Sequence, residues 1–157
     1  MKIKRLFFTG LTFLLLTCTL QAQNYNTSLG VRLGYDSGIA FKYITITDNA
    51  AEFILSASPR YFQLTGLYEH QRLVPGSSDL SWVVGVGGHL GNIHYDKHKY
   101  KSSFLLGFDL LAGLEYGIAQ TPYAISLDWK PAFNIINSDY NDYWFSGFAV
   151  SLRYRLN

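Results

Sequence analysis

Two acidic side chains interrupt an otherwise apolar run, SFLLGFDLLAGLEYG, between residues 103 and 117. In a β-strand, where alternate side chains share a face, Asp109 and Glu115 would project from the same side. In a helix they would lie roughly 120° apart, and the glycines of the run would weaken that helix. A buried carboxylate is costly without a basic partner. The run therefore predicts a strand with one apolar face and one face that forms ion pairs.

A second possible chemistry is general-base catalysis at His89. Ser102 or Ser103 begins the next apolar segment, which we expect at a similar height to the histidine. Asp109 or Asp128 could orient the imidazole, as in a catalytic triad. No recognisable motif surrounds either serine, however, and a histidine inside a protein is more often a hydrogen-bonded filler. We therefore predict that the protein is not an enzyme.

Metal binding is the third chemistry that the residue types allow. His94 and His98 flank Asp96 in the stretch GNIHYDKHKYKS. A metal site needs a further ligand at fixed geometry, and the stretch does not supply an obvious one. The sequence predicts no metal site and no cofactor.

The elements that would position these residues are strands, because an alternating pattern recurs along the chain. Each segment is about ten residues long, apolar on one face and small or charged on the other, which is typical of transmembrane barrels. The segments cover residues of about 27–35, 38–46, 51–60, 62–70, 80–91, 103–117, 122–133 and 145–156. We predict an all-β fold, an eight-stranded antiparallel up-and-down transmembrane barrel.

Aromatic residues on the apolar face support a membrane barrel over a lipocalin-like barrel in water. If the first strand starts in the periplasm, the outward rings gather at two levels, as rings do at membrane interfaces. A barrel in water carries its apolar face inside and has no reason for two such levels. The periplasmic level holds Tyr43, Tyr68, Trp82, Tyr116, Tyr123 and Tyr154, and the outer level holds Tyr35, Trp129 and Trp144.

The first residues indicate export. Residues 1–22 have a basic start, an apolar stretch and a small residue at Ala22, which predicts a signal peptide followed by a barrel domain over residues 23–157. Cys18 leaves a lipoprotein alternative open. Without Lys2, Lys4 and Arg5, the thirteen basic residues fall to ten against eleven acids. The remaining chain has no basic surplus for nucleic acid and no cysteine for disulfides or thiol catalysis.

Charged residues on the predicted inward face are nearly balanced in sign. The interior of an eight-stranded barrel is only just wide enough for its own side chains, so we expect these charges to neutralise one another and plug the lumen. A narrow ion path lined by the same groups is the alternative. The predicted network comprises Arg32, Lys42, Glu52, Arg60, Glu69, Asp109, Glu115, Asp128, Lys130, Arg153 and Arg155.

Two segments between strands, GNIHYDKHKYKS and NIINSDYNDYW, are candidate outer loops. Loops on a rigid scaffold commonly carry binding residues, and tyrosine and tryptophan are favoured at contact sites. Solvated loops without a partner are the simpler interpretation. The binding candidates are His94, Lys97, Lys99, Tyr140, Tyr143 and Trp144.

The stretches RYFQLTGLYEHQ, SWVVGVGGHLG, SLDWKPAFN and FAVSLRYRLN resemble those of the small, largely uncharacterised outer-membrane β-barrel proteins of Gram-negative bacteria. The resemblance implies the cell outer membrane as location, and outer-membrane lipid and the barrel assembly machinery as partners. It implies no defined activity. We expect a porin-like membrane protein with a structural or surface-interaction role, a narrow pore and a lipid-modifying enzyme being the alternatives.

Overall fold

The computed structural model describes residues 26–45, 48–58, 61–94, 102–136 and 147–156. Strands account for most of these residues, and none of the described residues is helical. Within them, accordingly, no helix is long and apolar enough to cross a membrane. The strands are β1 (Thr27–Gly34), β2 (Gly38–Ile44), β3 (Asn49–Ser58), β4 (Tyr61–Leu73), β5 (Leu80–His94), β6 (Ser102–Gly117), β7 (Tyr123–Trp129), β8 (Ala132–Ile136) and β9 (Phe148–Leu156).

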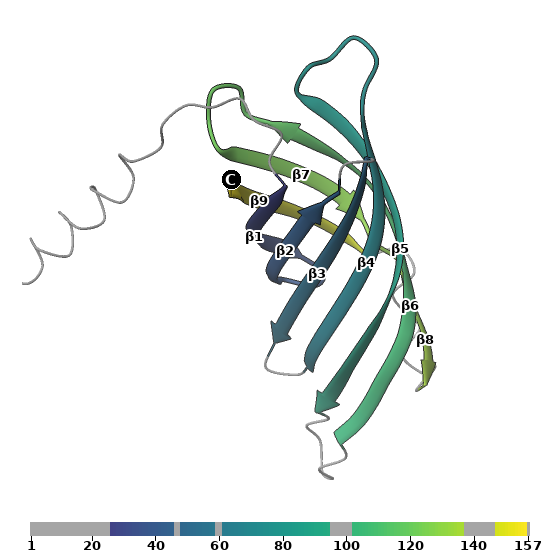
Figure 1. Ribbon diagram of the computed structural model, residues 1–157. Helices are drawn as coiled ribbons and strands as arrows, with labels where there is room; N and C mark the ends of the chain where they lie inside the picture. Colours follow the sequence, from purple (N-terminus) through teal and green to yellow (C-terminus); the bar gives the residue numbers. More distant parts are fainter. Residues whose placement is uncertain (1–25, 46–47, 59–60, 95–101, 137–146, 157) are drawn as a thin grey trace, which may run out of the picture.

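The strands form one closed antiparallel barrel (Figure 1). Neighbours in sequence pair with one another from β1 to β6, and β9 closes the ring between β7 and β1. β7 and β8 are two halves of one strand, because Trp129 lies opposite Ala112 and Ala132 opposite Asp109 along β6. Pro131 falls between the halves and has no N–H to donate. The predicted eight-stranded antiparallel barrel is confirmed.

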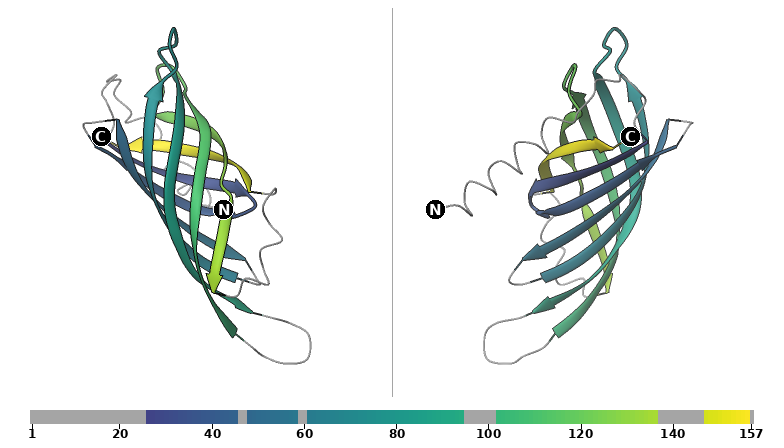
Figure 2. Two further views of the ribbon diagram at one scale, coloured as in Figure 1. Left: turned by 90° about the vertical axis from the view of Figure 1, so that its right-hand side faces the viewer. Right: turned by 60° about the vertical axis from the view of Figure 1, so that its left-hand side comes forward.

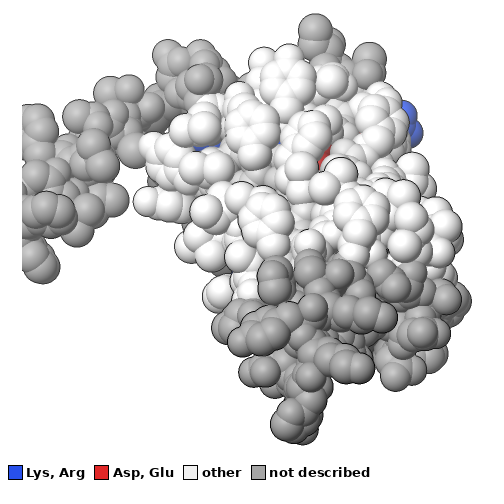
Figure 3. Space-filling view, turned by 90° about the horizontal axis from the view of Figure 1, so that it is seen from below, with Lys and Arg blue, Asp and Glu red and all other residues white. Residues whose placement is uncertain are grey.

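The two faces of the wall have opposite polarity. On β1, the outward Leu29, Val31 and Leu33 are 48%, 55% and 65% exposed, whereas the inward Ser28 and Arg32 are fully buried. The same alternation holds along β2, β3 and β9. Seen from below, the described surface is almost entirely free of charged side chains (Figure 3). Charged groups are therefore collected inside the barrel, where a small apolar cluster of Ala40, Ile54, Leu67, Val83 and Leu111 accompanies them, and the outer face is apolar.

The barrel has two distinct ends, visible in Figures 1 and 2. At the end we call the terminal end, β1 begins, β9 ends, and short turns join β2 to β3, β4 to β5 and β6 to β7. The opposite end, the distal end, carries the two longest connections, residues 95–101 and 137–147, and also the two shortest, residues 35–37 and 59–60. The wall is uneven in height, since β4, β5 and β6 have 13, 15 and 16 residues against 8 and 7 in β1 and β2.

Outward aromatic side chains lie towards the terminal end on several strands. Tyr123 and Tyr154 make an edge-to-face contact across β7 and β9, with ring centres 5.5 Å apart. Tyr43, Tyr68 and Tyr116 are each about half exposed. Trp129 instead lies further along β7, against Phe148, and Trp144 lies outside the described residues.

Closure of the barrel can be tested by cross-linking β1 to β9. Val31 lies opposite Leu152, and Cα atoms of directly opposite residues are about 4.5–5.5 Å apart, within disulfide range. In a Cys18→Ser background, Val31→Cys with Leu152→Cys should form a disulfide, detected by a gel shift that a reductant reverses. Val31→Cys with Phe148→Cys, roughly 13 Å out of register, is the matched control. Equal cross-linking of the two pairs would contradict the closed register.

Candidate functional site

The inward-facing charged side chains gather in two clusters, one above the other along the barrel axis. Long side chains from several strands meet in each cluster, and nearly all of them are buried. The terminal cluster contains Lys42, Glu52, Glu69, Glu115 and Arg153. The distal cluster contains Arg32, Asp36, His89, Asp109, Asp128 and Lys130.

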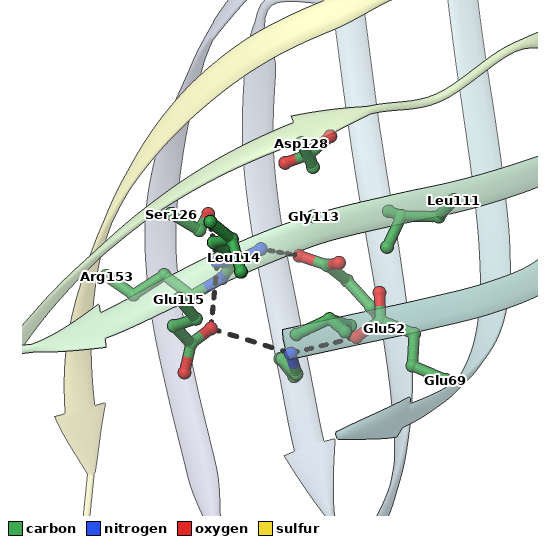
Figure 4. A pocket seen from close by; sticks show the side chains of 11 residues that line it. Glu52, Glu69, Leu111, Gly113, Leu114, Glu115, Ser126, Asp128 and Arg153 are labelled. Carbon is green, nitrogen blue, oxygen red and sulfur yellow. Dashed lines mark hydrogen bonds and ion pairs between the residues drawn. The ribbon is translucent and has the colours of Figure 1, made fainter. Parts of the chain in front are cut away.

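Arg153 organises the terminal cluster by crossing the lumen from β9 (Figure 4). Its Nη2 atom lies 2.5 Å from Oε1 of Glu52 on β3, and its Nη1 atom lies 3.1 Å from Oε2 of Glu115 on β6. Nη1 also donates to the hydroxyl of Ser126 on β7. One guanidinium therefore ties together four strands that are not all neighbours in the wall.

Lys42 completes the terminal cluster from β2. Its Nζ atom is 2.8 Å from Oε2 of Glu69 and 3.5 Å from Oε2 of Glu115. Gln71, two residues after Glu69 on β4, donates to the other oxygen of Glu115 at 3.0 Å. Each oxygen of the Glu115 carboxylate is thus engaged.

Arg32 is the anchor of the distal cluster. It makes a two-pronged contact with Asp128, from Nη1 to Oδ2 at 2.7 Å and from Nη2 to Oδ1 at 2.6 Å. Its Nε atom donates to Asp36 at 2.7 Å. This fork geometry is the strong form of an arginine–carboxylate pair.

Lys130 and His89 extend the distal cluster across the lumen. The Nζ atom of Lys130 lies 2.8 Å from Asp109 Oδ1 and 3.2 Å from Asp36 Oδ2. His89 places Nδ1 2.8 Å from Asp109 Oδ2 and Nε2 2.8 Å from the side-chain oxygen of Asn134. Both imidazole nitrogens are therefore occupied by polar groups of the wall.

Each cluster combines two basic side chains with three carboxylates, and the distal cluster adds His89. Charges buried in this way depend on one another, because removing one partner leaves the other unpaired. A cavity of about 10 Å³ lies against the terminal cluster, whose five members all line it, and it also touches Asp128 of the distal cluster. That volume holds about one water molecule.

Inward glycines provide the space that the larger side chains occupy. Gly107 lies opposite His89, and a methyl group on it would come within 2.5 Å of the imidazole and closer still to the carbonyl oxygen of Phe133. Gly117 likewise lies beneath the guanidinium of Arg155, a half-buried residue nearer the barrel mouth. At both positions, the glycine leaves room in the lumen for a large side chain beside it.

Three polar members of the site were missed by the sequence analysis: Asp36, Gln71 and Asn134. Continuing the period-two alternation would have found them, since Asp36 follows Arg32 and Gln71 follows Glu69 on the inward face. Asn134 follows Lys130 in the same way. Gln71 and Asn134 are uncharged, and Asp36 lies beyond the end of the first expected strand, so the predicted charge network did not include them.

The catalytic hypothesis for His89 is wrong about its serine partner, although Asp109 does contact the imidazole as expected. His89 lies opposite Gly107, whereas Ser103 lies opposite Ile93 and Ser102 opposite His94. The serines are thus at least four residues further along β6, roughly 13 Å. The strand that supplies a partner to Nε2 is β8, through Asn134, and not β6.

Several predicted site residues cannot be located in the described structure. Arg60, Lys97, Lys99, Tyr140, Tyr143 and Trp144 lie outside the described residues, and His94 ends β5 without a described side chain. Among the described residues, no group of three or more His, Cys, Asp or Glu side chains is arranged to hold a metal ion.

Comparison with known proteins gives the fold and no more. No family model matches the chain, and no curated protein sequence matches it. Its barrel is similar to the N-terminal β-barrel domain of Pseudomonas aeruginosa OprF. The TM-score is 0.60 at 14% sequence identity, covering 84% of this chain and 100% of that one. At this identity the similarity concerns the arrangement of strands and carries no activity across.

Replacing Arg153 by methionine should lower the free energy of unfolding by about 3–5 kcal/mol, because Glu52 and Glu115 lose a buried partner. Urea unfolding of the refolded barrel, followed by tryptophan fluorescence, measures the change. Arg72→Met is the matched control, since the Arg72–Asp48 pair is well exposed and should cost under about 1 kcal/mol. Similar losses in the two variants would contradict a stabilising role for the terminal cluster.

Gly107→Ala should be destabilising by about 1–3 kcal/mol, because the added methyl group overlaps both His89 and the wall behind it. The outward Gly66 has only ordinary contacts with Phe53 around its Cβ position, so Gly66→Ala should stay close to the parent protein. The same urea titration compares the two. An unaffected Gly107→Ala barrel would show that the imidazole does not need this space.

Proposed function

We propose that the protein is a small outer-membrane barrel with a closed lumen, acting as a structural or surface-interaction protein and not as an enzyme. Residues 1–22 would act as its export signal. The distal end would face outwards, because outer-membrane barrels have short periplasmic turns and longer outer loops. The distal connections would then be the surface available to a partner.

The observation that carries this proposal is that the outer face of the wall is apolar while charged side chains fill the interior. Large apolar side chains are about half exposed all round the outside, which is costly in water and favourable against lipid. Inside, two ion-pair clusters join strands that are not neighbours in the wall, β1 with β7 and β9 with β3. The cavity beside the terminal cluster holds about one water molecule and is too small for a hydrated ion.

A narrow pore is the second candidate function. The support for it is the cavity itself, since it touches both Asp128 of the distal cluster and Glu115 of the terminal cluster. A rearrangement of ion pairs on either side would join it to the barrel mouths. A lipid-modifying enzyme has less support, because both nitrogens of His89 are engaged within the described wall.

The closed lumen predicts no stable current when the refolded protein is inserted into a planar bilayer. A heat-dependent gel shift would confirm that each sample is a folded barrel. The variant Arg32→Ala/Arg153→Ala removes the crossing side chain of each cluster and should conduct in the molecules that still show the shift. A conducting parent protein would contradict the proposal and support the narrow pore.

A further inference from the structure

One corner of the outer wall differs from the rest. Along the outward face of the described strands, Arg72 near the end of β4 is the single charged side chain. It lies at the terminal end, on the tall side of the barrel where β4 and β5 rise past their neighbours (Figure 1). Everywhere else on this face the described side chains are apolar, aromatic, small or uncharged polar.

Arg72 is held by the carboxylate of Asp48, which lies between β2 and β3. Its Nε atom lies 3.2 Å from Oδ2 of Asp48, and the two side chains are 61% and 58% exposed. Asp48 adopts a left-handed backbone with φ of 57°, and its carbonyl oxygen accepts a hydrogen bond from the backbone N–H of Gln71. The pair is therefore fixed in place by the backbone while both charged groups stay open to an external ligand.

Aromatic rings separate this ion pair from the apolar wall. Trp82 lies directly opposite Arg72 on β5, and its ring centre is 5.6 Å from that of His70. The Nδ1 atom of His70 is 2.9 Å from the side-chain oxygen of Asn49, which orients the imidazole. Below the rings, Tyr68 and Val84 continue the exposed apolar surface. Along the wall, the apolar surface is thus followed by His70 and then by the level that Trp82 and Arg72 share.

We propose that this corner binds the headgroup of a zwitterionic phospholipid, with phosphatidylethanolamine as its type. The inference rests on the proposed membrane location. The Arg72 guanidinium would bind the phosphate through its Nη donors, because its planar fork matches the geometry of a phosphate group. The Asp48 carboxylate would bind the ammonium group. Trp82 and His70 would lie at the level of the glycerol, where amphipathic rings are favoured, with the acyl chains along Tyr68 and Val84.

Charge complementarity selects this occupant over an anionic lipid. The site offers one cation and one anion at hydrogen-bond distance, which matches a headgroup that carries both signs. A phosphatidylglycerol headgroup would meet the guanidinium equally well but would also face the carboxylate without an ammonium group to offset it. Removing the carboxylate alone should therefore reverse the preference.

The test is native mass spectrometry of the full-length mature barrel released from vesicles that contain equal phosphatidylethanolamine and phosphatidylglycerol with identical acyl chains. The parent protein should retain phosphatidylethanolamine preferentially. Arg72→Gln should reduce that retention about tenfold, the loss expected for a charge-assisted contact, and Asp48→Asn should shift the preference to phosphatidylglycerol. Asp79→Asn is the matched control, because Asp79 lies in the turn 74–79 at the same end and contacts Ser78.

Equal retention of the two lipids by the parent protein, or an unchanged Arg72→Gln variant, would overturn the headgroup site. The proposed function is read separately, from the heat-dependent gel shift and from protection of the inserted barrel against protease. A barrel that fails to insert would overturn both proposals. An inserted barrel without lipid preference would overturn the headgroup site alone.

Discussion

The space around the axis of an eight-stranded barrel admits side chains and little else, and this constraint governs the interior of the protein. Because the outer face is apolar, the polar half of every strand must be accommodated in that space. Charges confined there are tolerable only as neutralising, hydrogen-bonded sets. The fork between Arg32 and Asp128, the guanidinium of Arg153 shared by two carboxylates, and the glycine beneath His89 are three responses to the same shortage of room.

The fold was predictable because a barrel with an apolar outer face and a charged interior requires apolar and polar residues to alternate along each strand. The run around Asp109 and Glu115 shows this alternation. Which charges pair was not predictable, because pairing depends on the stagger between strands, and alternation does not encode stagger. For this reason the serine hypothesis for His89 was wrong. The residue opposite His89 on β6 is Gly107, and the Nε2 atom of His89 contacts Asn134 on β8. The break at Pro131 divides a strand that alternation alone would have continued.

We propose separate roles for the two faces of the wall. The lumen residues hold the barrel closed and have little contact with anything outside it, so they bear on stability and conduction. On the outward face of the described strands, Arg72 is the single charged side chain, and the uneven wall raises the corner that it forms with Asp48 on the tall side. A substitution of a lumen residue should therefore leave the properties of the outward face unchanged, and a substitution on the outward face should leave the lumen unchanged.

The closing pair of strands has a consequence for the order of assembly. β1 and β9 meet through residues more than one hundred positions apart, such as Thr27 and Leu156, and contacts so distant in sequence form late. Until they form, β1 exposes an unpaired edge, which is a site for aggregation. The same event brings Arg153 to Glu52 on β3, whereas its contact with Glu115 spans only β7 and lies on one side of the seam. An open intermediate would leave Glu52 and Glu69 beside Lys42 without the guanidinium, so neutralisation of these carboxylates and closure of the backbone occur in one step.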